Sequence, residues 1–177
     1  MSAVTTPGIV LRPARPTDLD AITGLHTEAR AAYYRAGGYS GTELTSAEAR
    51  SQRRAVWQRA VRDDTRSVLC AMRGEELAGV AAMGPPLDTD LDATTVGQLH
   101  QIHVRPDYWG QGVGGRLHAA YVRFLREASL HTEVLEAWER NRRAHAFYAH
   151  HGWHPDGHRR PGPADADYVR LRIDVSS

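Results

Sequence analysis

The chain has 177 residues, 41% hydrophobic and 24% charged, which suits one ordinary globular domain with its own core. Its formal net charge of +1 excludes a global field for nucleic acid or an anionic membrane, so any anion site has to be local. All 22 basic residues are arginine, which excludes a Walker A phosphate loop and a lysine Schiff base, because both require a lysine.

The cellular compartment is indicated by the cysteine content and by the hydrophobic runs. The single cysteine, Cys70, cannot form an internal disulfide, which favours a reducing environment. Residues 1–18 contain no apolar core of a signal peptide, and no run approaches the length of a membrane span. We therefore expect a cytoplasmic protein that binds neither membrane nor nucleic acid.

Hydrophobic periodicity and turn residues predict an alternation of strands and helices. The expected elements are strands at 8–14, 67–73, 77–83, 96–104, 132–139 and 168–175, and helices near 17–35, from Thr45 onward, at 112–128 and at 141–151. Thr17 with Asp20, and Thr45 with Glu48, resemble the capping pairs that open helices. This order indicates a single α/β domain.

The expected strand at 96–104 has an irregular hydrophobic pattern. Leu99, Ile102 and Val104 are its best core candidates, yet residues 99 and 102 would lie on opposite faces of a regular strand. One extra residue near His100–Gln101, a β-bulge, would return both to the core and expose backbone groups to an extended ligand. A strand buried on both faces is the alternative.

Between this strand and the next helix the chain is rich in glycine. Gly110, Gly112 and Gly115 match the dinucleotide pattern G-x-G-x-x-G, but five residues, including Pro106, separate Val104 from Gly110. A dinucleotide-binding strand runs almost directly into its first glycine, so that interpretation is weak. Backbone N–H groups near the positive end of the helix dipole would suit a diphosphate. A tight turn without a ligand is the plainer alternative.

Two stretches, LHQIHVRPDYWGQGVGGRL and NRRAHAFYAHHGW, together resemble the GCN5-related N-acetyltransferase (GNAT) superfamily. The acetyl-CoA signature of the family, R/Q-x-x-G-x-G/A, falls on 109–114, with Trp109 in the place of arginine or glutamine. The resemblance extends over essentially the whole chain. It implies one GNAT-like domain over 1–177, with a mixed central sheet of about 6–7 strands and about four flanking helices.

The resemblance also implies that acetyl-CoA is the acyl donor. No metal is expected, because Gly152 and Pro155 interrupt any helical register of the nearby histidines and no H-E-x-x-H motif is present. The diphosphate would lie against the loop residues Trp109, Gly110, Gln111, Gly112, Val113, Gly114 and Gly115. The pantetheine arm would pair as an additional strand with the edge formed by Ile102, His103 and Val104. Further charge for the phosphates could come from Arg105, Arg116 and Arg142.

Asn141 and Tyr148 are seven residues apart, about two helical turns, and therefore face the same way. In the family the asparagine contacts the cofactor, and the tyrosine hydroxyl lies near the sulfur, where it can protonate the departing thiolate. The plainer alternatives are a helix N-cap for Asn141 and a core aromatic for Tyr148.

The sequence offers several candidates for the general base that would deprotonate the amine. The family carries a glutamate on the strand before the glycine loop, and the matching residue, Gln98, cannot accept a proton. Glu136, five residues before Asn141, is the first candidate, and His100 is the second; His103 lies on the same strand. A relay of ordered waters, or an arginine-paired structural role for Glu136, are the alternatives.

The predicted activity is transfer of an acetyl group from acetyl-CoA to a primary amine of a small molecule or protein. The amine would attack directly, without a covalent enzyme intermediate. The acceptor pocket is expected around 31–41, opposite the loop 84–95. Five acidic residues could attract a cationic amine there: Glu43, Glu48, Asp88, Asp90 and Asp92. A non-catalytic acyl-CoA-binding sensor is the alternative. The acceptor is unknown, and a homodimer is left open.

Overall fold

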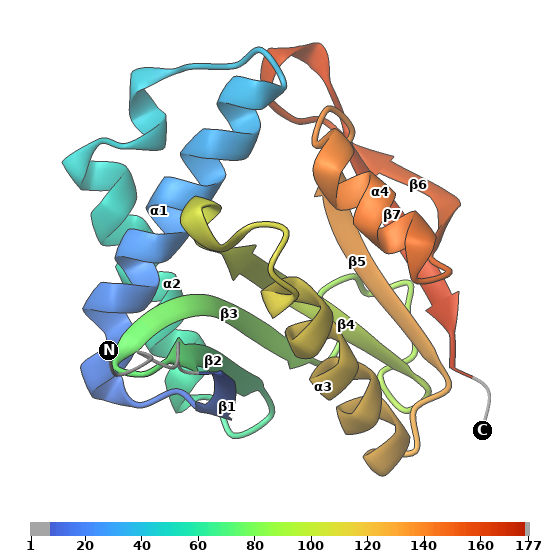
Figure 1. Ribbon diagram of the computed structural model, residues 1–177. Coiled ribbons are helices and arrows are strands. Elements are labelled where there is room, and N and C mark those ends of the chain that lie inside the picture. Colours follow the sequence, from blue (N-terminus) through green and yellow to red (C-terminus); the bar gives the residue numbers. More distant parts are fainter. Residues whose placement is uncertain (1–7, 176–177) are drawn as a thin grey trace.

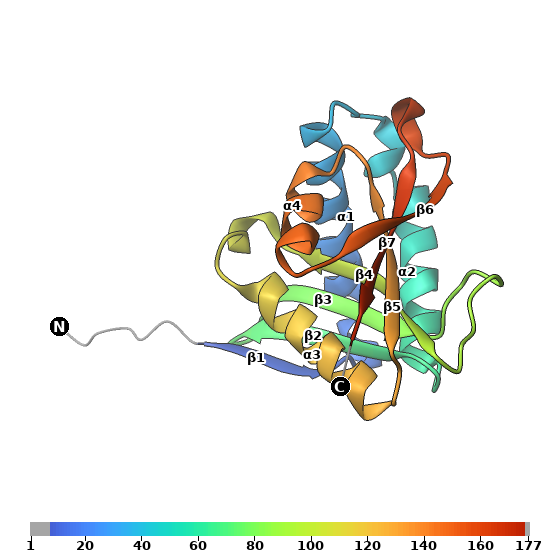
Figure 2. The same ribbon diagram turned by 90° about the vertical axis from the view of Figure 1, so that its right-hand side faces the viewer.

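The computed structural model describes residues 8–175 as a mixed seven-stranded sheet with helices on both faces (Figure 1, Figure 2). The strands are β1 (Ile9–Pro13), β2 (Ser67–Arg73), β3 (Glu76–Gly84), β4 (Val96–Val104), β5 (Thr132–Trp138), β6 (His154–Arg160) and β7 (Tyr168–Asp174). The helices are α1 (Leu19–Ala36), α2 (Ala47–Arg62), α3 (Val113–Glu127) and α4 (Arg142–His150). The predicted α/β fold with a mixed sheet and four helices is confirmed. None of the described helices is long and apolar enough to cross a membrane.

The strand order is β1-β2-β3-β4-β5-β7-β6, and β4 and β5 run parallel while the other neighbours run antiparallel. The parallel pairing covers only Val96–Gln98 against Thr132–Val134. Beyond it the two strands diverge, and Figure 1 shows the widening gap between them. Over 99–104 the edge of β4 that faces β5 therefore has no partner strand among the described residues.

The predicted bulge in β4 is confirmed. Ala82 of β3 lies opposite Gln101, and Met83 lies opposite Leu99, so His100 is the extra residue. The additional residue brings Leu99 and Ile102 onto the same face of the sheet, where both pack in the core below α3.

Helices cover both faces of the sheet (Figure 2), and each face has its own core. On one face α1 and α2 pack on β2 and β3 through residues that include Ile22, Leu25 and Trp57. On the other, α3 and α4 pack through a larger cluster that includes Leu117 and Tyr148. Helices α1 and α3 pack on β4 from opposite faces, so the core stays covered where β4 diverges from β5.

Both expected helix caps are wrong by one or two residues. A 3-10 turn at Pro16–Asp18 precedes α1, so Thr17 does not cap that helix. The N-cap of α2 is Ser46, whose side chain accepts a hydrogen bond from the Ala49 N–H at 3.2 Å. In each case neighbouring residues compete for the cap, and the tertiary position of the helix decides between them.

The strand β6 was not predicted. Its sequence, His-Pro-Asp-Gly-His-Arg-Arg, has no alternating apolar pattern, and its pairing with β7 shifts between Pro155 and Arg159. It lies at the edge of the sheet, where proline and polar side chains are tolerated because one edge of the strand needs no partner.

Glu133 of β5 is fully buried below α3, beside Tyr121. Burial raises the pKa of its carboxyl group to about 9, against a smaller opposite effect of the Tyr121 hydroxyl. Neither carboxyl oxygen has a well-formed hydrogen bond among the described residues. The group is therefore protonated at neutral pH in the folded chain.

We expect this carboxyl group to make stability depend on pH. An unfolded glutamate ionises near pH 4.5 and the folded one near pH 9, so stability from Glu133 is lost as the pH rises through this window. Relative to Glu133→Gln, the free energy of unfolding of the wild type should fall by up to about 1.4 kcal/mol per pH unit between pH values of about 6.5 and 8.5. Urea unfolding across this range measures the difference. Parallel curves for the two proteins would contradict a buried neutral carboxyl group.

Candidate functional site

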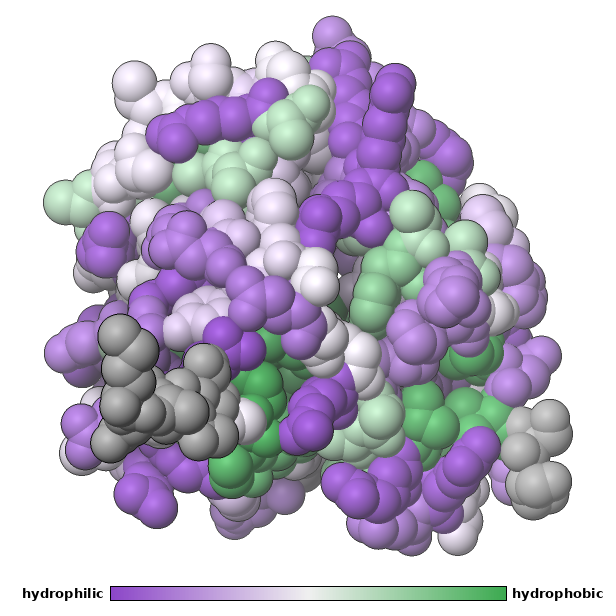
Figure 3. Space-filling model, viewed as in Figure 1, coloured by the Kyte–Doolittle hydropathy of each residue, from purple (hydrophilic) through white to green (hydrophobic). Residues whose placement is uncertain are grey.

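The opening between β4 and β5 is the centre of the candidate site. The glycine loop and α3 border it on the β4 side, and α4 borders it on the β5 side (Figure 1). In the space-filling view the same face is hollowed near its middle, between these two parts of the chain (Figure 3). An extended ligand that enters here meets the unpaired edge of β4.

The glycine loop presents main-chain N–H groups at the start of α3. Gly110 and Gly112 have φ of 75° and 83°, a left-handed conformation that strains other residues. The first hydrogen bond of α3 joins the Arg116 N–H to the Gly112 carbonyl at 3.1 Å. The N–H groups of 113–115 therefore have no intrahelical acceptor and lie at the positive end of the helix dipole.

The space next to three glycines of the loop contains no other protein atoms. A Cβ added at Gly110, Gly112 or Gly115 would meet no atom within 4 Å. At Gly114 an added Cβ would lie 3.6 Å from the ring of Phe147 in α4, so this glycine borders the packing of α3 on α4. The loop thus has the open main-chain surface that a diphosphate requires.

Trp109 stands at the first position of the acetyl-CoA signature, and its side chain makes contacts within the protein. Its indole Nε1–H donates to the Val104 carbonyl at 2.9 Å, and the Arg143 guanidinium lies 4.6 Å from its ring centre. Trp109 therefore links the end of β4 to the loop, and Arg143 of α4 supplies a positive charge close to it.

The arginines expected to hold phosphates are partly engaged elsewhere. Arg105 pairs with the Glu76 carboxylate, and Arg116 donates to the Ile9 carbonyl at 2.6 Å. Arg73 of β2 donates to the Gln111 side chain at 2.9 Å and so lies at the loop. Arg73 and Arg143 were missed in the sequence, because the contacts that bring them to the loop join distant parts of the chain.

Tyr148 of α4 is buried in the core, and burial, with a smaller effect of the Tyr33 phenol, raises the pKa of its hydroxyl. Tyr33 belongs to α1, which covers the other face of the sheet. Asn141 is the N-cap of α4, where its Oδ1 accepts from the Ala144 N–H at 3.2 Å. A further contact of Asn141 with a cofactor stays a prediction.

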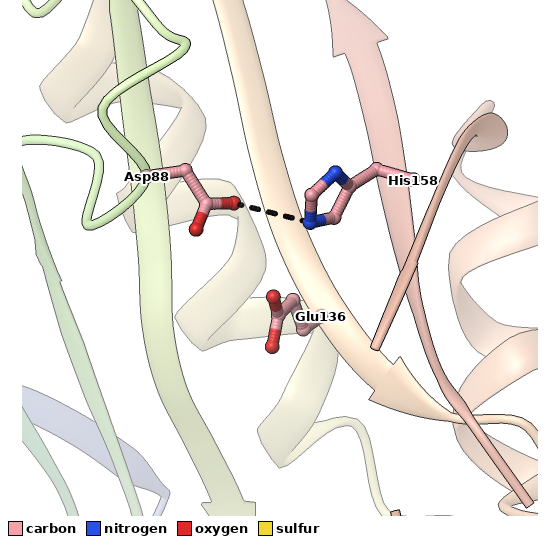
Figure 4. Close-up of side chains that lie close together, drawn as sticks. All are labelled: Asp88, Glu136 and His158. Atoms are coloured by element: carbon pink, nitrogen blue, oxygen red, sulfur yellow. Dashed lines mark ion pairs between the residues drawn. The ribbon is translucent and has the colours of Figure 1, made fainter. Parts of the chain in front are cut away.

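Glu136 lies on β5, just past the last residue paired with β4. Its carboxylate accepts from Arg160 at 2.5 Å and lies close to Asp88 and His158 (Figure 4). The ligand atoms of these three side chains are all within 4.8 Å of one another. Arg160 on Glu136, and Arg170 on Asp88 at 3.0 Å, already balance both carboxylates, so the group forms an ion-pair network.

The loop 84–95 is held by the same network. Besides Asp88, Arg170 of β7 binds Asp90 at 3.1 Å and Asp156 at 2.6 Å. Asp92 accepts from the Thr94 N–H at 2.9 Å within the loop. These carboxylates therefore fix the loop, and the attraction of a cationic acceptor that we expected of them receives no support from their contacts.

Gln98 and His100 also face this loop. Gln98 accepts a hydrogen bond from the Leu87 N–H at 2.8 Å. The His100 Nε2 lies 2.7 Å from the Pro85 carbonyl, and burial lowers the pKa of its ring. The structure thus places His100 against the loop, and it brings neither Glu136 nor Tyr148 into contact with it.

His103 lies on the opposite face from Ile102 and stacks on His26 of α1, with ring centres 4.0 Å apart. Burial lowers the pKa of His103 to about 3 and that of His26 well below its usual value. The Trp57 indole N–H donates to His26 Nδ1 at 3.0 Å. His26 was missed in the sequence, although a polar residue between Ile22 and Ala29 on the buried side of a helix is a detectable signal.

Comparisons with known proteins identify the family. A family model described as Acetyltransferase (GNAT) family matches residues 25–153. A search of curated protein sequences finds no match to this chain.

Several solved structures have the same fold. The PaiA N-acetyltransferase of Thermoplasma acidophilum, in complex with coenzyme A, has a TM-score of 0.74 at 17% identity, over 94% of this chain and 99% of that one. The ribosomal-protein-S18-alanine N-acetyltransferase of Escherichia coli has a TM-score of 0.68 at 20% identity, over 96% of both chains. The yncA protein of Salmonella typhimurium, solved with acetyl-CoA, has a TM-score of 0.69 at 15% identity, over 96% of this chain and 95% of that one.

The resemblance drawn from the two sequence stretches is thereby confirmed. The matched segment begins in α1 and ends just after α4, so it contains the glycine loop, the opening and Tyr148. This chain belongs to the GNAT acetyltransferase family.

Proposed function

We propose that the protein transfers an acetyl group from acetyl-CoA to a primary amine. The observation that carries the proposal is the unpaired edge of β4 next to the free N–H groups at the start of α3. A ligand with a diphosphate at one end and peptide-like amides at the other matches both features. Coenzyme A has this composition, and two of the structural neighbours contain coenzyme A or acetyl-CoA.

The proposal that the acceptor atom is a nitrogen is supported by the structural neighbours that are named as N-acetyltransferases. In the reaction the neutral amine nitrogen forms a bond to the acetyl carbon, and the bond from that carbon to sulfur breaks. The amine loses one proton, and the departing thiolate gains one. The protein therefore needs one group that accepts a proton and one that donates it.

Tyr148 is the proposed proton donor. Its hydroxyl makes no hydrogen bond among the described residues, and α4, the helix that carries it, borders the opening. The raised pKa of the phenol keeps it protonated until the thiolate forms. The sulfur of coenzyme A would then receive the phenolic proton.

Glu136 is the proposed proton acceptor. It stands on the β5 side of the opening, and its partner Arg160 is half exposed and can move away. The pKa of His103, about 3, makes that imidazole a weak base, and His100 is bonded to the Pro85 carbonyl. Water molecules between Glu136 and the amine would extend the reach of the carboxylate.

Binding of acetyl-CoA is tested at Gly115. An added side chain there meets no protein atom, so Gly115→Asp should fold normally while its charge repels the diphosphate. Calorimetry should show acetyl-CoA binding by the wild type, and binding at least about tenfold weaker for Gly115→Asp than for the matched control Gly115→Ala. A wild type that ignores acetyl-CoA would overturn the proposed function.

The proton donor is tested with Tyr148→Phe. Thiol release from acetyl-CoA with a panel of amines should show kcat lowered about 100-fold or more, with the Kd for acetyl-CoA little changed. Tyr121→Phe is the matched control, because this tyrosine is buried in the same core but lies under α3, beside Glu133. Acetyl-CoA binding without turnover, in the wild type and across the panel, would instead identify a sensor module.

The proton acceptor is tested with Glu136→Gln, again through thiol release. We expect kcat/KM about 100-fold lower near neutral pH, with the deficit shrinking as the pH rises and the amine loses its proton unaided. Glu139→Gln is the matched control, because Glu139 also pairs with an exposed arginine, Arg159. A deficit that stays constant with pH would show that Glu136 serves only to pair with Arg160.

A further inference from the structure

A pocket of about 390 Å³ lies between α1, α2 and β4, on the opposite face of the sheet from α3. Among the residues that line it are His26, Arg30, Arg53 and Gln101. Gln101 accepts from His103 at 2.7 Å, and His103 belongs to the unpaired edge of β4. The pocket therefore ends next to the edge of β4 that is proposed to bind the pantetheine arm of acetyl-CoA.

The chemistry of His26 is fixed by its neighbour. Since the Trp57 indole donates to Nδ1, that nitrogen carries no proton, and the low pKa keeps the ring neutral. The single ring proton is then on Nε2, which is a donor. The side chain is 4% exposed, and Nε2 has no hydrogen-bond partner among the described residues. A buried donor without an acceptor costs free energy unless a ligand supplies one.

The two arginines of the pocket also lack an anion. Arg53 donates to the Thr27 hydroxyl at 3.0 Å and to the Leu44 carbonyl at 2.8 Å, both uncharged. Arg30 lies over the Tyr34 ring, and its buried Nε has no partner. Within 8–175, neither guanidinium has a carboxylate at ion-pair distance.

The positive charges of Arg30 and Arg53 repel each other, and this repulsion affects the pKa of Arg53. Burial, and next the charge of Arg30, lower the pKa of Arg53. Glu43 also lines the pocket, but its carboxylate lies over the backbone of Gly41 and pairs with neither arginine. An oxyanion between the arginines would neutralise the repulsion and accept hydrogen bonds from both.

We propose that this pocket binds a carboxylate of the acceptor, so that the acceptor carries an amine and a carboxylate in one molecule, as amino acids do. The inference rests on the proposed acetyl transfer and names its substrate class. With the carboxylate between Arg30 and Arg53, the amine points along the pocket toward the edge of β4. An acceptor that offers only cationic groups would leave both guanidinium groups and the His26 N–H without an acceptor.

The test compares amino acids with their carboxamides, which keep the amine and lose the negative charge. The probes are the α-amino acids, β-alanine and γ-aminobutyrate, each beside its carboxamide, in the thiol-release assay with acetyl-CoA. The variants are Arg30→Gln and Arg53→Gln. Arg54→Gln is the matched control, because Arg54 is the next residue on α2 but pairs with Asp20 outside the pocket.

At least one acid should exceed its carboxamide about tenfold or more in kcat/KM, and each pocket variant should reduce that preference about 10- to 100-fold. Arg54→Gln should retain it. Equal use of acids and carboxamides, or a preference that survives both pocket variants, would overturn the proposal. Thermal melting checks that each variant is folded. If Arg53→Gln is not, Arg30→Gln decides alone, because Arg30 makes no hydrogen bond among the described residues.

Binding without turnover is measured separately, through the nuclear magnetic resonance signal of the Trp57 indole N–H, which reports on His26. The acids should shift this signal and the carboxamides should not. No shift with any acid at millimolar concentration would overturn the proposal, even if the enzyme acetylates other amines. Failure of the proposed acetyl transfer would give a different result. Acetyl-CoA would then not bind, or no amine would release thiol, regardless of whether the acids shift the Trp57 signal.

Discussion

The site depends on the divergence of β4 from β5 after three paired residues. Two parallel strands that stayed paired would satisfy each other's backbone groups and leave no edge for an extended ligand. The bulge at His100 breaks the regular register of β4 just where the divergence begins. Helices on both faces, and the packing of Trp138 against Tyr34 beyond the opening, keep the strands apart while the core remains closed.

Much of this arrangement was predictable from the sequence, because it is encoded in local patterns. The positions of Leu99 and Ile102 on opposite faces of a regular strand indicated the bulge. The glycines at 110 and 112 indicated a loop with accessible backbone N–H groups, and the structure adds that both have positive φ. Periodicity located the strands and helices that carry apolar side chains. It failed for β6, whose edge position allows a strand without a hydrophobic face. It also missed the caps, where adjacent polar residues are locally equivalent.

The partners of charged residues were not predictable, because they depend on contacts between distant segments. In the sequence the acids of the loop 84–95 looked free to attract an amine, yet Arg170, 80 residues beyond Asp90, binds both Asp88 and Asp90. Conversely, His26 and Arg30 looked like ordinary helix residues, and only the packing of α1 on α2 and β4 shows that they face a pocket without an anion. Local patterns therefore located the bulged strand and the glycine loop, whereas the pocket beside α1 and α2 is visible only in the tertiary structure.

The stacked rings of His26 and His103 connect these two sides. A molecule that displaces one ring would disturb its face-to-face contact with the other. His103 is flanked by the two residues whose backbone would hold the thioester arm, and His26 is tied to α2 by the Trp57 indole. In the proposed reaction the donor lies along the strand that carries His103 and the acceptor lies beside His26, so this one ring contact adjoins both substrates.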